Sequence, residues 1–299
     1  MDGLMTSATG MIRKVRAGIR LAAGKWTPGP ELEVYPDDTF LIAYSKSGNT
    51  WTRFLVANLL YPGRPVTFLN IPDLVPHFDV KSKRFFREMA RPRVINCHET
   101  FRAHFKRVIY VVRDPRDVAV SLFHFQRKRR IIADDYSLDL FVSRFVAGEA
   151  LRPPRLGSWG DNAGSWLYMR QGTPGFLLLR YEDLLAQTEL EMARIAAFLG
   201  IEATPERISQ AVSASSAHRM RNLEKIQGEQ WHQSKETRQD IPFVRAARSG
   251  GWKSALPEGA VAEIESAWGG IMTRLGYELS TDKALRVAKG ERFVGDLRH

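Results

Sequence analysis

Four short apolar runs alternate along the chain with longer segments whose apolar residues recur at helical spacing. Runs of this length, rich in valine, isoleucine, leucine and phenylalanine, are typical of buried strands. They lie at Phe40–Tyr44, Val94–Cys97, Val108–Arg113 and Phe176–Tyr181. Because strands that alternate with helices form βαβ units, the pattern predicts an α/β fold with a central parallel sheet and helices on both faces.

Helices are predicted where apolar residues recur every three or four positions. The expected helices are Trp51–Leu60, Pro115–Phe125, Leu138–Val146, Ser158–Arg170, Glu189–Leu199, Pro205–Ala217 and Glu258–Leu275. Two of them carry end signals. Gly200 suits the position after a helix C-terminus, and Thr204 offers a capping hydroxyl just before Pro205.

Two long segments show no steady period: residues 62–92 are rich in proline, charge and aromatics, and residues 227–257 are polar and contain glycine. Irregular segments this long inside a compact domain usually act as lids or binding loops, so we expect them to cover a binding site. No repeat or linker divides the sequence. We therefore predict one domain over residues 31–280, preceded by a basic extension at 1–30 and followed by a tail at 281–299.

Composition and charge narrow the function only slightly. The 299 residues are 44% hydrophobic and 26% charged, as in ordinary globular proteins. The net charge of +11 favours a polyanionic partner, whether nucleic acid, an anionic membrane or a multiply charged nucleotide. No zinc-finger, ribonucleoprotein or basic-zipper pattern occurs, so nucleic acid rests on charge alone and is not expected. The basic run Arg127–Arg130 is interpreted as a solvated loop after a helix.

The single cysteine, Cys97, excludes an intramolecular disulfide and suits a reducing compartment, so we expect a cytoplasmic protein. Residues 11–26 combine apolar residues at helical spacing with arginine and lysine on the remaining face. Three interpretations stay open for them: a helix packed on the domain, a helix lying on anionic lipid, and an Arg-rich organelle presequence. Peripheral membrane contact through this segment is therefore an alternative to a purely cytoplasmic protein.

The most distinctive segment is the polar loop between the first strand and the first helix. It reads Tyr44-Ser45-Lys46-Ser47-Gly48-Asn49-Thr50-Trp51. Such a loop directs backbone N–H groups and a helix N-terminus at one point, which is how many proteins bind phosphate or sulfate. It is not a Walker A sequence, because the first glycine is missing and Lys46 precedes Gly48. The loop therefore predicts an anion site that is not an ordinary nucleoside-triphosphate site.

The same loop resembles the 5′-phosphosulfate loop of the cytosolic sulfotransferases, whose donor is 3′-phosphoadenosine 5′-phosphosulfate (PAPS). Family members usually read Tyr-Pro-Lys-Ser-Gly-Thr-Thr-Trp there, so Ser45 and Asn49 depart from the pattern. The resemblance implies that the donor is bound by Lys46, Ser47, Gly48, Asn49, Thr50 and Trp51. Trp51 resembles the tryptophan that stacks on adenine, although a core aromatic at a helix start would look the same.

A second segment, Val108–Ser121, resembles the family's 3′-phosphate segment, in which an arginine and a serine hold the phosphate. Those roles fall on Arg113 and Ser121. An arginine supplies a planar fork of donors and a serine a hydroxyl, which suits a dianion. Without the resemblance, Arg113 would be interpreted as a surface ion-pair partner of Asp114 or Asp117.

A third segment, Arg245–Lys253, resembles the family pattern Arg-Lys-Gly-x-x-Gly-Asp-Trp-Lys. Its phosphate clamp is incomplete, because Ala246 and Ala247 replace the lysine and the glycine. We hypothesise that Arg248 supplies the missing charge. The residues that the resemblance places at the phosphate are Arg245, Arg248, Ser249 and Gly250.

Two weaker matches fall on the adenine side. Residues 181–184 resemble a family segment whose tyrosine contacts the nucleoside, a role that falls on Tyr181. The segment Ser215–Met220 vaguely resembles the one that flanks the base, with an alanine where phenylalanine is usual. Ser215 is therefore a candidate for the site that binds the adenine.

Sulfuryl transfer to a hydroxyl needs a base for the acceptor proton and a cation for the leaving oxygen. His98 directly follows a predicted strand, and ligands of open parallel sheets bind beyond the carboxyl ends of strands, so His98 and Lys46 should converge. An isolated histidine there is more often structural. It resembles, however, the catalytic histidine of the family's Lys-Thr-His segment, with Asn96 in place of the lysine. Glu99 is a second candidate base.

The resemblance spans residues 40–253 and implies a P-loop-like sulfotransferase domain that moves the sulfuryl group of PAPS to an alcohol, phenol or amine. Lys46 would stabilise the bridging oxygen, and Ser47 would restrain Lys46 until an acceptor arrives. No metal is implied, because lysine and backbone dipoles replace magnesium. Two rivals remain. A P-loop small-molecule kinase would need magnesium and prefer ATP, and a basic module on nucleic acid or membrane would not discriminate among nucleotides.

The acceptor is expected to be a small or lipid-like molecule held by the two irregular segments. Their aromatic residues are compatible with such an acceptor, but they could equally belong to the core. The candidates are Phe68, Phe78, Phe85, Phe86, Trp231 and Phe243. Neither the acceptor's identity nor the oligomeric state can be derived from the sequence.

Overall fold

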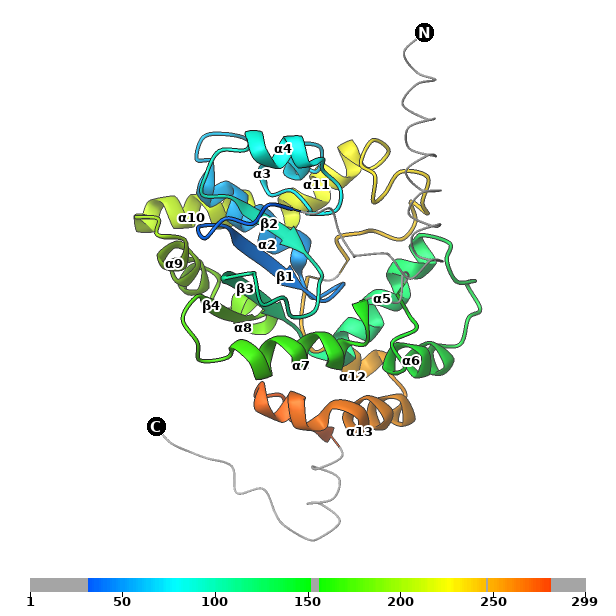
Figure 1. Ribbon diagram of the computed structural model, residues 1–299. Helices are drawn as coiled ribbons and strands as arrows, with labels where there is room; N and C mark the ends of the chain where they lie inside the picture. Colours follow the sequence, from blue (N-terminus) through cyan, green and yellow to red (C-terminus); the bar gives the residue numbers. More distant parts are fainter. Residues whose placement is uncertain (1–31, 152–155, 246, 281–299) are drawn as a thin grey trace, which may run out of the picture.

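A parallel sheet lies at the centre of the protein (Figure 1). The computed structural model describes residues 32–151, 156–245 and 247–280. Its strands are β1 (Thr39–Ala43), β2 (Val94–Cys97), β3 (Arg107–Val112) and β4 (Phe176–Arg180). They lie in the order β2-β1-β3-β4, and every neighbouring pair is parallel. The four predicted strands and the predicted parallel sheet are confirmed.

Helices surround this sheet and include all seven that the sequence predicts. Those of the described residues are α2 (Asn49–Leu60), α3 (Ile71–Leu74), α4 (Lys83–Glu88), α5 (Pro115–Lys128), α6 (Leu138–Val146), α7 (Trp159–Arg170), α8 (Tyr181–Ala186), α9 (Thr188–Leu199), α10 (Pro205–Ala214), α11 (Ala217–Gln227), α12 (Trp252–Ala255) and α13 (Glu258–Arg274). The sequence missed α3, α4, α8, α11 and α12. Four of these have six residues or fewer, and α11 buries one residue, so none shows a clear apolar period.

Apolar residues cover both faces of the sheet because helices cover both faces. Side chains alternate along a strand, so Phe40 and Ile42 of β1 face one core while Leu41 and Ala43 face the other. The first core is completed by α5, α6, α7 and α13, and the second by α2, α9 and α10. Figure 1 shows α7 and α13 on one side of the sheet and α9 and α10 toward the other. The predicted two-sided architecture is confirmed.

Helix ends follow local signals, with one correction. Gly200 adopts φ 72 after α9, and the Thr204 hydroxyl accepts a hydrogen bond from the Arg207 amide at 3.3 Å, as predicted. The helix predicted to reach residue 217 ends at 214. Ser216 interrupts it, because its hydroxyl accepts from the Arg219 amide at 3.4 Å and caps a new helix, α11.

The two segments predicted to be irregular are partly ordered. The first contains α3 and α4, and the second contains α12. The first also pairs with the sheet edge: His77 forms a parallel bridge to Asn96, where the Phe78 amide donates to the Asn96 carbonyl at 2.9 Å and the Asn96 amide to Pro76 at 2.8 Å. This pairing fixes His77 beside β2. The strand predicted to end at Tyr181 stops one residue earlier, because Tyr181 opens α8.

The interpretation of Arg127–Arg130 as a solvated loop is wrong for its first half, which belongs to α5. The Lys128 side chain is 2% exposed, and its ammonium donates to the carbonyl oxygens of Arg238 and Ile241 at 2.9 and 2.8 Å. A buried ammonium needs such acceptors, since burying it unpaired is costly. Lys128 therefore ties the segment after α11 to α5.

The predicted extension at 1–30, with its basic segment 11–26, and the predicted tail at 281–299 lie outside the described residues. The domain limits and the interpretations of that segment therefore stay predictions. Among the helices that the structure describes, none combines the length and the apolar character needed to cross a membrane.

Candidate active site

A cavity of about 1110 Å³ lies at the carboxyl ends of the strands. Each strand contributes a residue to its wall from the position where the strand ends, namely Lys46 after β1, His98 after β2, Arg113 after β3 and Tyr181 after β4. The expected convergence of Lys46 and His98 is therefore present. The predicted site residues that line the cavity are Lys46, Gly48, Asn49, Thr50, Trp51, His98, Arg113, Ser121, Tyr181, Arg245 and Arg248.

Four predicted site residues do not line the cavity: Ser47, Ser215, Ser249 and Gly250. Ser47 is fully buried, and its hydroxyl has no hydrogen-bond partner among the described residues. Ser249 is exposed. The Gly250 amide donates to Asp117 at 2.7 Å, so it holds the loop instead of facing the cavity. Their roles in binding stay predictions.

The loop after β1 depends on a glycine. Gly48 precedes α2 with φ 98, a left-handed conformation that L side chains rarely adopt. A Cβ atom there would lie 2.5 Å from Cδ2 of Tyr181, so the ring packs directly on the loop backbone. Only glycine lets the loop, the start of α2 and Tyr181 meet in this way.

The Lys46 side chain lies between two aromatic rings. Its Nζ is 4.3 Å from the ring centroid of Phe125 and 4.3 Å from that of Phe243. Burial, followed by the positive charges of Arg113 and Arg245, lowers the pKa of Lys46 to about 7. The lysine thus gains or loses its charge near neutral pH, and an anion beside it would favour the charged form.

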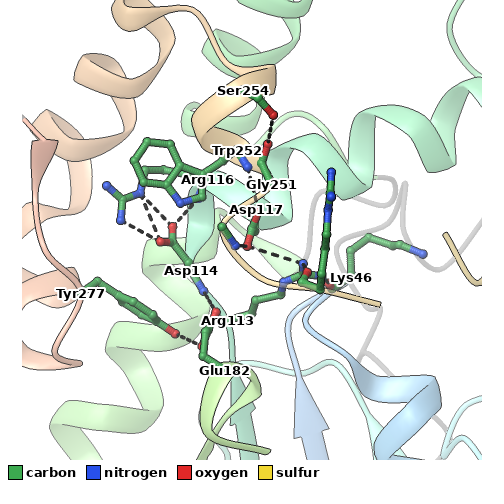
Figure 2. A network of polar contacts seen from close by, with 12 residues as sticks. Lys46, Arg113, Asp114, Arg116, Asp117, Glu182, Gly251, Trp252, Ser254 and Tyr277 are labelled. Carbon is green, nitrogen blue, oxygen red and sulfur yellow. Dashed lines mark hydrogen bonds and ion pairs between the residues drawn. The ribbon is translucent and has the colours of Figure 1, made fainter. Parts of the chain in front are cut away.

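Arg113 connects the loop to the third predicted segment (Figure 2). Its Nη2 donates to the Arg248 carbonyl at 3.0 Å, its Nη1 lies 3.5 Å from the Lys46 carbonyl, and its guanidinium stacks 4.3 Å from the Tyr181 ring. It pairs with Asp117 at 3.6 Å and not with Asp114. Its side chain is 11% exposed, so this is not the surface ion pair that would be expected without the resemblance.

Asp117 organises the loop that carries the arginines. Its carboxylate accepts hydrogen bonds from the backbone amides of Gly250 and Trp252 at 2.7 and 3.0 Å (Figure 2). This fixes the segment that includes Arg245 and Arg248 beside Arg113. Burial and the neighbouring charge of Arg113 lower the pKa of Arg245, which shows that cations gather here. Such a cluster suits a ligand with several negative charges.

Ala247 replaces the glycine of the family pattern, and the backbone explains the usual glycine. Ala247 adopts φ 49, in the left-handed region. An alanine there costs about 1–2 kcal/mol relative to a right-handed conformation. This position therefore keeps the loop geometry that glycine would provide, at some cost in stability.

Trp51 and Tyr181 form the aromatic wall of the cavity. Their rings meet edge to face with centroids 5.7 Å apart. The Trp51 Nε1–H donates to the Ser215 carbonyl at 3.0 Å, while the Ser215 hydroxyl accepts from Asn58 at 3.0 Å and donates to Ala211 at 2.8 Å. Ser215 thus positions Trp51 from behind.

His98 is held by backbone and side-chain contacts. Its Nδ1 lies 2.6 Å from the Ala43 carbonyl oxygen, and its Nε2 lies 3.3 Å from the Asn49 amide nitrogen. Because a carbonyl oxygen only accepts, Nδ1 carries the hydrogen and Nε2 is the basic nitrogen. Burial and the neighbouring His77 lower the pKa of His98 to about 4. The ring is therefore a neutral base at physiological pH.

The second candidate base, Glu99, does not line the cavity. It is buried and accepts a hydrogen bond from Arg102 at 2.6 Å. Of the aromatic candidates for the acceptor site, Trp231 and Phe243 line the cavity, whereas Phe68 stacks behind Trp231 with ring centroids 4.2 Å apart. For the other aromatic residues the second alternative, a place in the core, holds. Those that belong to the core or pack against it are Phe68, Phe78, Phe85 and Phe86.

The sequence matches a known family. The family model described as "Sulfotransferase domain" matches residues 36–276. The chain belongs to the sulfotransferase family. This confirms the predicted family and the predicted class of enzyme. A 3-beta-hydroxysteroid sulfotransferase of Cavia porcellus is 29% identical, over 79% of this chain and 83% of that protein. Cytosolic sulfotransferase 12 of Arabidopsis thaliana is 30% identical, over 78% of this chain and 76% of that protein.

The fold of this sulfotransferase is also found in solved structures. A mouse sulfotransferase complexed with 3′,5′-adenosine bisphosphate (PAP) superimposes with a TM-score of 0.63 at 21% identity, and the match covers 87% of this chain and 91% of that one. The predicted single P-loop-like α/β domain is confirmed. Within the described residues of the sulfotransferase, no group of three or more histidine, cysteine, aspartate or glutamate side chains could hold a metal ion.

Phe125 and His77 are among the cavity-lining residues of this sulfotransferase that the sequence did not predict. Phe125 follows Asp117 and Ser121 on α5 at intervals of four, so all three share one helix face, and that spacing was an available signal. His77 had no such signal, because it lies in a segment without a period. Its ring centroid is 5.3 Å from that of His98, and its Nδ1 pairs with Asp79.

Proposed function

We propose that this sulfotransferase transfers the sulfuryl group of PAPS to a hydroxyl or amine of a small, largely apolar acceptor, with His98 as general base and Lys46 as the cation at the leaving oxygen. The observation that carries the proposal is that one cavity holds both residues together with the arginine cluster. A base and a cation facing one space are what sulfuryl transfer requires.

The donor site suits a nucleotide with phosphate groups at its 3′ and 5′ positions. The Arg113 Nε is buried without a partner among the described residues, and a phosphate oxygen in the cavity would supply an acceptor for it. The loop of Lys46 and the start of α2 would bind the 5′ side. The 3′-phosphate would lie among Arg113, Ser121 and the arginines of residues 245–248, and the adenine against the wall formed by Trp51 and Tyr181.

The reaction then needs one proton transfer and one bond exchange. Nε2 of His98 takes the proton from the acceptor hydroxyl as its oxygen bonds to sulfur. The bond between sulfur and the bridging oxygen breaks, so PAP leaves with an additional negative charge on its 5′-phosphate. The Lys46 ammonium stabilises that charge, since its protonated form is favoured by an adjacent anion.

The acceptor is proposed to be lipid-like, because much of the remaining cavity wall is apolar. That wall includes Val80, Ile131, Ile132, Leu151, Trp231 and Phe243. The Cavia porcellus relative is named for a hydroxysteroid, which supports an apolar alcohol. We also propose a cytosolic location, as the name of the Arabidopsis thaliana relative suggests. Vesicle co-sedimentation of the full chain and of a variant lacking residues 1–28 tests the membrane alternative.

A thermal-shift comparison of PAP, AMP and ATP tests the donor. At about 100 times its dissociation constant a ligand adds roughly 2.7 kcal/mol of stability, so PAP alone should give a large shift. A larger shift with ATP and magnesium would favour the kinase alternative, and equal shifts would favour a non-specific basic module.

The Arg248→Ala variant tests whether the 3′-phosphate binds beside Arg248. Arg248 is exposed and lines the cavity, and its loss should weaken PAP about tenfold, since a charge-assisted contact is worth about 1.5 kcal/mol. AMP, which lacks the 3′-phosphate, is the matched ligand control and should bind the variant as it binds the wild type. Unchanged PAP affinity would remove Arg248 from the site.

A further inference from the structure

A closed circuit of hydrogen bonds surrounds the candidate base. It begins at the Leu41 carbonyl of β1, passes through the amides of Asn96 and Asn49 to the His98 ring, and returns to β1 at the Ala43 carbonyl. Asn49 and Asn96 are 8% and 1% exposed. Both positions depart from the family pattern quoted above, and the two departures contact each other.

The orientation of the Asn96 amide is fixed by β1. Its Nδ2 donates to the Leu41 carbonyl oxygen at 3.0 Å. A carbonyl oxygen accepts only, so the amide cannot turn its own oxygen toward Leu41 without burying two facing acceptors.

The Asn49 amide is fixed in turn. Asn96 Nδ2 donates to Asn49 Oδ1 at 2.8 Å, and Asn49 Nδ2 donates to Asn96 Oδ1 at 3.2 Å. Turning one amide alone would set donor against donor and acceptor against acceptor. Asn49 therefore keeps its nitrogen, with one further hydrogen, toward Nε2 of His98 at 3.3 Å.

The hydrogen bonds on the two sides of the ring favour the same tautomer. The Ala43 carbonyl requires a hydrogen on Nδ1, and the Asn49 N–H requires a lone pair on Nε2. An imidazolium would set an Nε2–H against the Asn49 N–H. Hydrogen bonding to the neutral form disfavours the charged form of a titratable group.

We propose that the Asn49–Asn96 amide pair is a positioning device that keeps Nε2 of His98 unprotonated and directed until the acceptor hydroxyl replaces the Asn49 N–H. This rests on the proposed role of His98 as base. The acceptor O–H would then donate a hydrogen bond to Nε2 in place of the Asn49 N–H. Both asparagines are thus positioning residues that act through His98.

Other groups also act on the ring and must be separated from the amide pair. His77, at the sheet edge, and Arg53, on α2, oppose a positive charge on His98, whereas Asp79 and the Ala43 carbonyl favour it. Burial acts in the same direction as the amide pair. A test therefore has to change the amide pair while these groups stay in place.

The experiment follows the His98 ring nitrogens by ¹⁵N NMR of the full chain from pH 4 to 8, without donor or acceptor, with His98→Gln to assign the signals. In wild type, His98 should stay neutral with its hydrogen on Nδ1 down to about pH 5. In Asn49→Asp the carboxylate accepts from an Nε2–H, so protonation should begin about one pH unit or more higher. Asn96→Ala leaves Asn49 in place but frees its amide to turn, and should shift protonation in the same direction.

Asn162→Ala is the matched control. Asn162 is a buried amide that donates to the His98 backbone carbonyl at 3.0 Å and does not touch the ring, so its loss should lower stability without moving the titration. If the Asn49 and Asn96 variants titrate like wild type, or only as far as Asn162→Ala does, the proposal is wrong. Should Asn49→Asp fail to fold, Asn96→Ala decides alone, and if that also fails, Asn96→Asp replaces it.

The pH profile of kcat separates this proposal from the proposed function. Its acid limb should move upward in Asn49→Asp and Asn96→Ala together with the NMR titration. If His98→Gln keeps full activity, His98 is not the base and the proposed mechanism fails, whereas the ring titration still reports on the amide pair. A merely structural role would lower activity at every pH and leave the acid limb unmoved.

Discussion

The Lys46 ammonium lies 4.3 Å from the ring centroid of Phe243. Phe125 from α5 lies on it at the same distance, so two distant parts of the chain hold the cation of the donor loop. A cation over an aromatic face is stabilised by about 0.5–2 kcal/mol. Burial opposes this, since it favours the uncharged amine. Lys46 is thus held where its charge depends on what else enters the cavity.

The affinity for PAP should therefore fall as pH rises through about 7. Burial lowers the pKa of Lys46 to about 7, while bound phosphate favours the ammonium, so binding above pH 7 must take up a proton. The loss approaches about tenfold per pH unit over the range where the free lysine is neutral and the bound one charged. Titration calorimetry between pH 6 and 9, in buffers of different ionisation enthalpy, measures both the affinity and the proton uptake.

Lys46→Arg should remove this dependence, because a guanidinium stays protonated over the whole range. Lys225→Ala, which changes an exposed lysine at the end of α11, should retain the wild-type dependence. A wild-type affinity that does not change with pH would contradict the assignment of a low pKa to Lys46.

His98→Gln should lower kcat by about 10²–10⁴-fold, the usual contribution of a general base. The wild-type rate should be almost independent of pH between 5 and 6.5, since burial lowers the pKa of His98 to about 4. A histidine with an ordinary pKa would instead lose half of the rate near pH 6.5. Initial rates at saturating donor and acceptor over this range distinguish the two cases.

Stability should depend on pH in the matching direction. The unfolded chain binds a proton at His98 near pH 6.5 and the folded chain near 4, so the neutral buried ring stabilises the fold fully above 6.5 and progressively less as pH falls toward 4. His98→Gln should flatten this part of the curve in urea unfolding. An unchanged slope would mean that other groups dominate it.

Apolar patterns predicted the strands and the long helices, because burial on two sides and helical spacing leave a strong signal. The site residues at the strand ends came from the resemblance to the sulfotransferases. The short helices and much of the apolar cavity wall left neither signal. His77 lies in a segment without a period, and only its pairing beside β2 brings it to His98. The same limit applies to Lys128, whose buried role depends on carbonyls that the chain supplies far away.

The motif departures show a second limit. Asn49 and Asn96 each weaken the resemblance when the sequence is considered one position at a time. In the fold they form a reciprocal amide pair, which no linear pattern expresses. Ala247 is the opposite case, since the glycine expected there corresponds to a left-handed backbone that the alanine keeps.

Gly48→Ala should destabilise the protein and disrupt nucleotide binding. The new Cβ would lie 2.5 Å from the Tyr181 ring, in addition to the strain of φ 98. Gly63→Ala is a matched control, because Gly63 also has a positive φ, 80, but nothing lies within 4 Å of its Cβ position. We expect about 1–2 kcal/mol of lost stability from backbone strain alone in the control, and a larger loss, with weaker PAP binding, in Gly48→Ala. Equal losses in urea unfolding would show that the contact with Tyr181 relaxes freely.

Lys128→Met should loosen the segment that carries Phe243 and Arg245 while leaving the sheet intact. The methionine fills the space of the lysine stem but leaves the Arg238 and Ile241 carbonyl oxygens without their donor, at a cost of about 1–3 kcal/mol each. Hydrogen exchange should increase over residues 228–245 and stay slow in β1 and β3. Arg130→Ala, at an exposed position of the same basic run, should change neither exchange nor PAP affinity. Because Phe243 lies on Lys46, the loosened segment should also weaken PAP binding. A Lys128→Met variant with normal hydrogen exchange and normal PAP affinity would show that water replaces the ammonium without consequence.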